Sequence, residues 1–442
     1  AYTVSETGQT KCYSTAGTIV CPQPEEPFFG QDAQYRSGNR SFTKLDGLSV
    51  PLPDNASDWA MVQDNVTGLI WEIKDNKDGT AAYANPHDAD NIYTWFDDNA
   101  SRNGGEAGKN GEGTDTTDFI VSLNTEAFGG FKDWRMPTAQ ELSRILDRGA
   151  AAAPYIDVAY FPHMVHEYWT STTDPTSPEQ SATLLLDNGQ MNFPSKISTY
   201  SAIAVRGALS LPLFYDNGDG TINDLTTGLM WQKQSTAELT WQQALAFCEA
   251  LSLAGYSDWR MPNINELQSL VDYSKSMPSI DAAFFPDTDY HYWSSTTFTT
   301  DPGRAYYDCF LRGRIEGYNK LQHSNIDHVR AVRGGIISEN DSTTTTTTTL
   351  PSTTTIPGNL CPVELVYGEH AAQTDLVRQY SREVLETTGY GRAFIDLYYL
   401  ISPMVARQLQ GCEALEEASR AILDPFILLL ASQGQCREHP DH

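Results

Sequence analysis

The residues best suited to chemistry form an oxygen-rich run in the middle of the chain. The sequence Asp216-Asn-Gly-Asp-Gly-Thr221, followed by Asp224, gathers several carboxylate and amide oxygens. Calcium prefers about six to eight oxygen ligands. The candidate cofactor is therefore calcium, and its candidate ligands are Asp216, Asn217, Asp219 and Asp224. Asn-Gly and Asp-Gly are also common in tight hairpin turns. The sequence favours the turn and leaves the metal site as the alternative.

A second candidate site is a group of cations in a strongly acidic chain. The 442 residues include 29 Lys and Arg against 57 Asp and Glu, a formal net charge of −28. Within residues 209–337 the dense basic cluster consists of Arg304, Arg312, Arg314 and Lys320. These four are the candidate ligand-binding residues for an anionic partner. The alternative is that they are ordinary solvated loop residues.

Composition excludes several classes of protein. Hydrophobic residues make up 40 % and aromatic residues 11 % of the chain, which is too much for a mainly disordered protein. A chain this acidic does not bind nucleic acid through counterion release, and it lacks the basic stripe of a membrane-surface protein. The longest apolar run, residues 426–431, is far shorter than the ~20 residues that span a bilayer.

The 7 cysteines fall into three regions of the chain. None forms a Cys-x-x-Cys pair, so zinc-ribbon and thioredoxin-like sites are not indicated. Pairing within each region predicts the disulfides Cys12–Cys21 and Cys248–Cys309, and it pairs Cys361 with Cys412 or Cys436. Such disulfides indicate an exported protein, whereas reduced thiols throughout would indicate a cytosolic one.

Known catalytic motifs are absent from the sequence. Neither Gly-x-Ser-x-Gly nor His-Glu-x-x-His occurs. Arg135 and Arg260 recur in matching contexts, and a buried arginine needs a partner. We expect Glu141 and Glu266 to supply structural ion pairs. The protein is therefore not expected to be an enzyme.

An internal repeat is the strongest organisational signal. Four blocks occur twice in one order: Asp-x-x-Thr-Gly-Leu-x-Trp, Asp-Trp-Arg-Met-Pro with a following Glu-Leu, Tyr-Trp-[Thr/Ser]-Ser-Thr-Thr, and Ala-Val-Arg-Gly. They begin at Asp64, Asp133, Tyr168 and Ala204 in the first copy, and at Asp224, Asp258, Tyr292 and Ala331 in the second. An insertion at about 75–117 in the first copy is rich in Asp, Asn and Gly and predicts a surface loop.

Local patterns within the repeats predict few helices and several short strands. Thr138 with Glu141, and Asn263 with Glu266, form capping boxes that start one helix in each copy. A further helix is predicted over 240–254, starting at Thr240. Each copy is therefore expected to be a compact α+β domain with long loops.

The ordered set of blocks resembles the C-terminal domain family of the Legionella collagen-like adhesin, over about residues 40–335. That family is similar to C-type-lectin-like folds, which also include the formylglycine-generating enzymes. The resemblance implies a secreted bacterial surface protein, and some relatives bind polyanionic glycans or host surfaces. The calcium-dependent sugar motifs Glu-Pro-Asn and Gln-Pro-Asp of lectins do not occur, so calcium-bridged sugar binding is not indicated.

The chain is predicted to have five segments. They are an extended N-terminal segment at 1–40, a first lectin-like repeat at 41–208, a second at 209–337, a Thr- and Pro-rich linker at 338–359 and a small all-α domain at 360–442. The last segment resembles the Cys-Phe-Ile-box tails of exported proteins, which implies a role in sorting.

Two functions are compatible with these features. The first is a secreted, non-enzymatic protein of the bacterial surface that binds a glycan or a surface protein and can self-assemble. The alternative is a structural subunit of an extracellular filament or matrix, a homo-oligomer held by its N-terminal segment and C-terminal tail. A formylglycine-generating-type oxidase is less favoured. The start at Ala1 predicts a mature chain that has lost a leader, and hence an extracellular or cell-surface location.

Overall fold

A computed structural model describes residues 4–35, 40–99, 113–164, 166–209, 212–236, 238–321 and 327–335. All of them belong to the first of two compact units, residues 1–342 and 343–442. The predicted linker at 338–359 and helical domain at 360–442 lie outside the described residues. So does the pairing of Cys361, Cys412 and Cys436.

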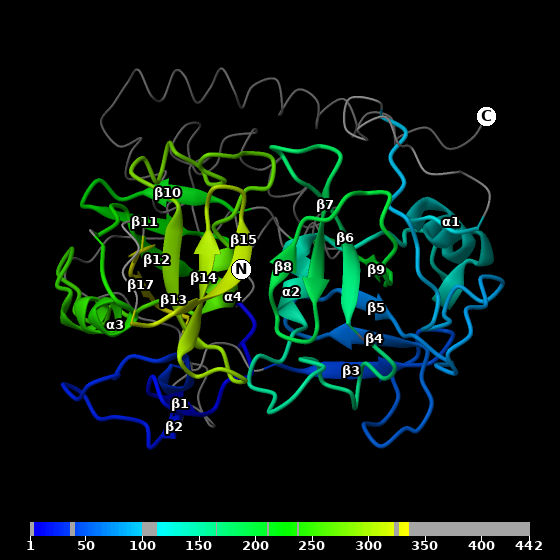
Figure 1. Cartoon of the computed structure of the whole chain (residues 1–442), viewed down its shortest axis with the longest axis horizontal. Coiled ribbons are helices and arrows are strands. Elements are labelled where there is room, and N and C mark those ends of the chain that lie inside the picture. The colour runs from blue at the N-terminus through cyan, green and yellow to red at the C-terminus, as the bar shows by residue number, and fades with distance from the viewer. Residues whose placement is uncertain are drawn as a thin grey trace, which may run out of the picture. The chain divides into compact units, whose positions relative to one another are not determined.

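The internal repeat is visible as two copies of one arrangement of short elements (Figure 1). The first copy contains β3 (Phe42–Leu45), β4 (Met61–Asp64), β5 (Ile70–Glu72), α1 (Thr116–Glu126), α2 (Ala139–Arg144), β6 (Glu167–Thr173), β7 (Ser181–Leu185), β8 (Met191–Asn192) and β9 (Val205–Arg206). The second contains β10 (Phe214–Asp216), β11 (Thr221–Asp224), β12 (Leu229–Gln232), α3 (Trp241–Ala250), α4 (Ile264–Gln268), β13 (His291–Thr297), β14 (Arg304–Cys309), β15 (Arg314–Asn319), β16 (Asp327–His328) and β17 (Val332–Arg333).

Each copy holds two small sheets. One is a four-stranded antiparallel sheet, ordered β3-β4-β5-β9 in the first copy and β10-β11-β12-β17 in the second. The other is ordered β6-β7-β8 in the first copy and β15-β14-β13-β16 in the second, and its β13–β16 pair is parallel. Four short α-helices complete the described part, as expected for an α+β fold. The C-type-lectin-like architecture stays a prediction.

Local sequence signals explain where the helices start. Thr138 and Asn263 cap α2 and α4, and Glu141 and Glu266 close the predicted capping boxes. α3 begins directly after Thr240, also in a capping box, and ends at residue 250 rather than at the predicted 254. These signals lie within four residues of sequence, so they need no tertiary information.

The predicted arginine ion pairs are confirmed in both copies. Arg135 and Arg260 lie 2.6 Å from the carboxylates of Glu141 and Glu266, respectively. Arg260 and Glu266 are almost completely buried, so each supplies the countercharge that the other needs. The pair fixes the start of the helix against the preceding Trp-Arg-Met-Pro block.

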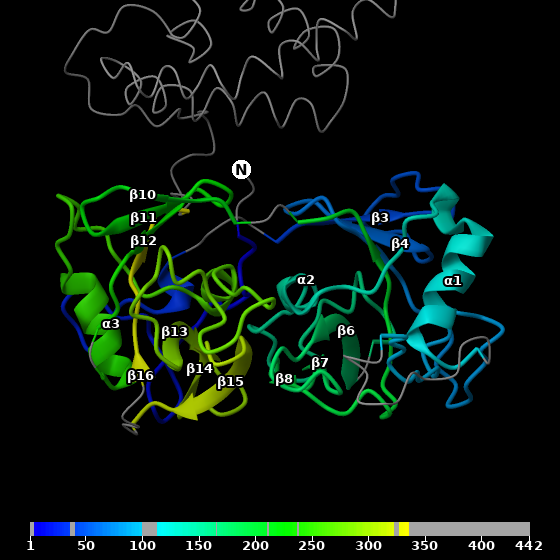
Figure 2. The same cartoon turned by 90° about the horizontal axis from the view of Figure 1, so that it is seen from above.

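The main hydrophobic cluster of the first copy extends into the second copy. Phe298, Tyr306 and Ile315 of the second copy join the core cluster of the first. α2 and α4 pack against each other where the copies meet (Figure 1). Across this contact, which we call the seam, Gln140 donates to the backbone oxygens of Gln268 and Val271, both at 2.8 Å. The repeats therefore form one body, with α1 and α3 at its opposite ends (Figure 2).

The N-terminal segment is folded onto the rest of the chain. It contains β1 (Cys12–Tyr13), β2 (Thr18–Ile19) and the 3-10 helix η1 (Asp32–Gln34), and the predicted Cys12–Cys21 disulfide is present. Buried Asp32 accepts hydrogen bonds from Thr7 and from Thr296 of the second copy. A Cβ on Gly149 would lie only 1.9 Å from the backbone oxygen of Gly8, so glycine is required where this segment meets the first copy.

Two sequence-based expectations need correction. The predicted Cys248–Cys309 disulfide is wrong, because both residues are free thiols. They contribute apolar volume to the cluster around Trp241 and Trp259 instead, a common role of reduced cysteine. The insertion at 75–117 is also more than a surface loop. Ala89 and the other buried residues between 88 and 97 pack on the first copy.

Candidate functional site

The oxygen-rich run at 216–221 forms the turn between β10 and β11, the structure that the sequence favoured. Its polar groups bind one another. Asp216 pairs with Lys233, and Asn217 donates to the hydroxyl of Thr221 at 2.8 Å. Asp219 accepts from the same hydroxyl at 2.6 Å. These contacts fix a hairpin turn without a metal ion.

The fourth predicted ligand, Asp224, serves a different turn. Its carboxylate accepts from the amide of Thr226 and from the hydroxyl of Thr227, at 2.9 and 2.7 Å. Asp64 and Thr67 make the same hydroxyl contact in the first copy, so Asp224 is a structural residue of the repeat. Among the described residues, no three His, Cys, Asp or Glu side chains are arranged to hold a metal. Calcium binding stays a prediction.

Two residues of the predicted basic cluster contact the first copy. Arg312 forms an ion pair at 2.6 Å with buried Asp174 of the first copy. Arg314 donates from Nε to the backbone oxygen of Met191 at 3.0 Å. Both guanidinium groups thus join the two copies.

The other two residues of the cluster are also bound internally. Lys320 is almost fully buried, with Nζ 3.9 Å from the centre of the Trp241 ring and 2.9 Å from the hydroxyl of Thr297. Burial lowers the pKa of Lys320 to about 7. Arg304 donates to the backbone of β15 and lies over the ring of Phe298. The structure therefore does not bring the four cations together on one exposed surface.

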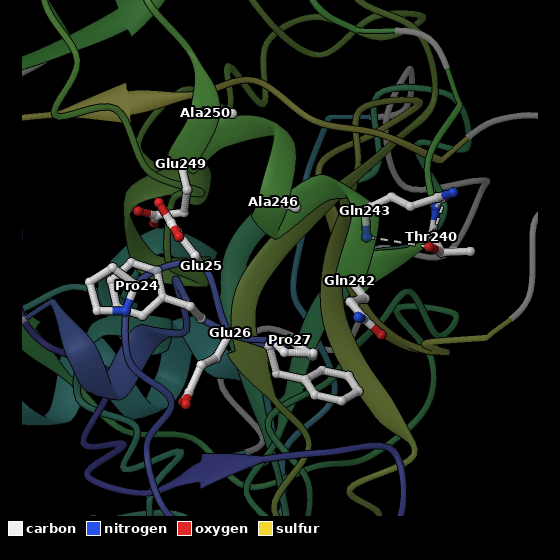
Figure 3. Close-up of a pocket in the computed structure, with 12 residues that line it drawn as sticks. Pro24, Glu25, Glu26, Pro27, Thr240, Gln242, Gln243, Ala246, Glu249 and Ala250 are labelled. Atoms are coloured by element: carbon white, nitrogen blue, oxygen red, sulfur yellow. Dashed lines mark hydrogen bonds between the residues drawn. The ribbon is translucent and has the colours of Figure 1, made fainter.

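A groove lies between the N-terminal segment and α3 (Figure 3). Its volume is about 780 Å³. One wall is formed by residues 24–29, and the other by Thr240, Gln242, Gln243, Ala246, Glu249 and Ala250. It is thus bounded by two segments more than 200 residues apart in sequence.

The sequence of α3 explains the shape of this groove. Trp241 and Leu245 are buried, whereas Gln242, Ala246 and Ala250 share the opposite, exposed face at a spacing of four residues. The small alanine side chains leave the helix surface hollow. On the facing wall, Glu25 and Phe28 have φ angles of 73° and 69°, in the left-handed region that non-glycine residues rarely adopt.

Glu249 is the most distinctive side chain of the groove. The phenol of Tyr35 donates to its two carboxylate oxygens at 2.7 and 2.8 Å. Burial raises the pKa of Glu249. Arg260, whose charge opposes that increase, is already bound to Glu266. In the described part of the chain, the partner of this half-buried carboxylate is therefore a neutral phenol.

The charge of the groove has a single sign. Among the described residues, Glu25, Glu26 and Glu249 line it, and no Lys or Arg does. Figure 3 shows Glu25 and Glu249 at the end of the groove near Ala250, while Gln242 and Thr240 lie toward the other end. The groove therefore combines an apolar surface with an acidic end.

The sequence model of the Lcl C-terminal domain family matches this chain twice, over residues 60–206 and 220–333. These ranges cover the two structural copies except for their first strands, β3 and β10. The chain belongs to the Lcl C-terminal domain family. No curated protein matches the chain. Within the described residues, no helix has the length and apolar character needed to cross a membrane.

The two Lcl domains use the position of Glu249 in different ways. The corresponding residue of the first domain, ten positions before the equivalent Trp134, is Asn124. The Asn124 side chain accepts from the backbone amide of Trp134 and donates to its backbone oxygen, both at 2.9 Å. In the second domain, Glu249 contacts the N-terminal segment and the groove instead. The difference between Asn124 and Glu249 is visible in the sequence, but by itself it does not predict a groove, which forms only where residues 24–29 meet α3.

The first Lcl domain has its own polar cluster beside a smaller pocket of about 240 Å³. Buried Glu72 lies 2.9 Å from Nζ of Lys74 and 3.0 Å from Nδ1 of His87. Lys74 also donates to the backbone oxygen of Pro86 at 3.0 Å. The residue of the second domain that corresponds to Glu72 is Gln232. The charged cluster therefore belongs to the first domain, where it holds the insertion.

Proposed function

We propose that this chain is an exported, non-enzymatic protein of the bacterial surface that binds a partner in the groove beside α3. Membership of the Lcl C-terminal domain family supports an adhesin-type role. The observation that carries the proposal is Glu249, a half-buried carboxylate that contacts the groove and is replaced by Asn124 in the other domain. A carboxylate that lines a groove and whose pKa is raised by burial is a candidate for a binding site.

The test compares two matched tryptophan variants, each expressed in a deletion strain of the bacterium that produces this protein. Ala246→Trp fills the groove. Val121→Trp places the same side chain at the corresponding exposed position of α1, where Val121 is 54 % exposed. We expect the wild-type protein and the Val121→Trp variant, both displayed at the cell surface, to restore attachment of the cells to a solid surface or host cell. The Ala246→Trp variant should leave cell attachment at the level of the deletion strain. Normal attachment with Ala246→Trp, or a chain that stays in the cytoplasm, would contradict the proposal.

Self-assembly is the second candidate function, and the β1–β2 hairpin favours it. Among the described strands, β2 pairs only with β1, so its other edge is free to add a strand. Val20, directly after β2, is 92 % exposed. Sedimentation velocity should show concentration-dependent oligomers that Val20→Lys abolishes. A monomer at every concentration would exclude this function.

A further inference from the structure

We propose that the occupant of the groove is a cationic peptide: an extended segment of a partner protein in which Lys or Arg lies beside apolar residues. This inference rests on the proposed function and names the chemistry of its partner.

Charge complementarity is the first argument. The described residues that line the groove include three carboxylates and no cationic side chain. The carboxylate of Glu249 has lost part of its hydration and is bound by an uncharged phenol. An ammonium or guanidinium group placed there would form a charge-assisted hydrogen bond, which is about twice as strong as a neutral one.

The position of Glu249 on α3 adds to this preference. Glu249 lies in the last turn of the helix, next to the C-terminal Ala250. The free carbonyl groups of a helix C-terminus carry a partial negative charge, and cations are stabilised there. Figure 3 shows Glu25 near the same end. The fixed charges therefore favour a cation at one defined end of the groove.

The rest of the groove suits apolar side chains of an extended chain. Ala246, Pro27 and Phe28 supply the apolar surface. The 10 residues of α3 extend about 15 Å, the length of about four to five residues in an extended peptide. Exposed Gln242 offers an amide for backbone hydrogen bonds. A polyanionic glycan is disfavoured, because its sulfates or carboxylates would face Glu25, Glu26 and Glu249.

The test is fluorescence anisotropy with the full chain and three labelled peptides. The probe is Gly-Ser-Val-Lys-Leu-Lys-Val-Ser-Gly, and the comparison peptides carry Gln or Glu in place of both Lys. We expect the lysine peptide to bind at least tenfold more tightly than the glutamine peptide, and the glutamate peptide not to bind. Affinity should fall as salt rises, because a cation–carboxylate contact is screened.

Matched variants locate the binding. Glu249→Gln should weaken the lysine peptide about tenfold, Ala246→Trp should abolish its binding, and Val121→Trp should leave it unchanged. Thermal unfolding by circular dichroism shows that each variant is folded. Equal affinity for the lysine and glutamine peptides, or unchanged affinity in Ala246→Trp, overturns the inference. Binding of a chitosan oligomer without binding of the peptide also overturns it, in favour of an amino sugar.

The two proposals fail separately. If Ala246→Trp abolishes cell attachment while no peptide binds, the groove functions in adhesion and the cationic-peptide inference is wrong. If the lysine peptide binds and Ala246→Trp cells attach normally, the peptide site exists and the adhesive function is wrong.

Discussion

Nη1 of Arg148 lies 2.7 Å from Oδ1 of Asn265, and this hydrogen bond joins the two Lcl domains inside the seam. Asn265 corresponds to Gln140 of the first domain, which itself crosses the seam in the opposite direction. Equivalent positions of the two domains therefore both reach across the seam, but Asn265 accepts from a side chain whereas Gln140 donates to backbone oxygens. Both partners are fully buried, so the seam is part of the core.

Arg148→Met should strongly destabilise the protein. It leaves the buried oxygens of Asn265 and Ser143 without this donor, and we expect the free energy of unfolding to fall by about 2–4 kcal/mol. Equilibrium unfolding in urea measures the change. The control is Arg206→Met, which removes a partly exposed ion pair with Asp133 and should cost less than about 1 kcal/mol. Equal losses in the two variants would contradict the role of Arg148 in the seam.

Asp308→Asn should stabilise the protein in a pH-dependent way. Burial raises the pKa of Asp308 to about 8, and one of its oxygens has no hydrogen-bond partner among the residues that the structure describes. The folded protein therefore holds a proton that the unfolded chain releases near pH 4, so stability is lost as pH rises from about 4 to about 8. Urea midpoints at pH 4, 6 and 8 should show no difference between variant and wild type at pH 4 and a growing advantage of the variant above it. A constant difference would refute the assignment.

Replacing Cys12 and Cys21 by Ser should loosen the groove wall while leaving the seam intact. The disulfide closes a loop with a sequence separation of 9, and its loss should cost about 3 kcal/mol in the chain-entropy model. Hydrogen exchange should accelerate in residues 12–35, which include the wall, and remain unchanged in α2 and β6. Uniform acceleration across the chain would show that the disulfide stabilises the whole unit instead.

Lys74→Met should cost far more stability than Lys275→Met. Lys74 neutralises completely buried Glu72, so its removal leaves a buried charge and should cost about 3–5 kcal/mol. Lys275 pairs with Asp272 on the surface, where both side chains are more than one-third exposed and the cost should be below about 1 kcal/mol. Thermal unfolding of both variants near pH 7 provides the comparison. Similar melting temperatures would mean that the Glu72 cluster is solvated.

Features encoded over short stretches of sequence were predictable. The capping residues Thr138 and Asn263 and the ion pair between Arg260 and Glu266 follow from signals within a few residues. The repeat itself was predictable because its blocks recur in one order. The local hairpin at 216–221 followed from its turn residues.

Features that depend on distant partners were not predictable. Arg312 and Arg314 are close in sequence, but their partners Asp174 and Met191 lie in the other domain. Charge density along a sequence therefore did not reveal that these side chains were already bound. The groove was missed for the same reason, since residues 24–29 meet α3 only in the folded chain. Cys248 and Cys309 were paired by proximity in sequence, which does not bring two sulfur atoms together.

The seam bears on how many equivalent surfaces one chain can present. Two separate Lcl domains paired through this face would form a homodimer with two identical binding surfaces. Covalent linkage of the copies allowed their outer ends to differ, so α3 carries Glu249 where α1 carries Asn124. In the described part of the chain, the acidic groove therefore belongs to the second domain. If the groove binds the proposed partner, avid attachment to a surface would gain from several chains displayed together, because within the described residues α1 does not repeat the acid at the position of Glu249.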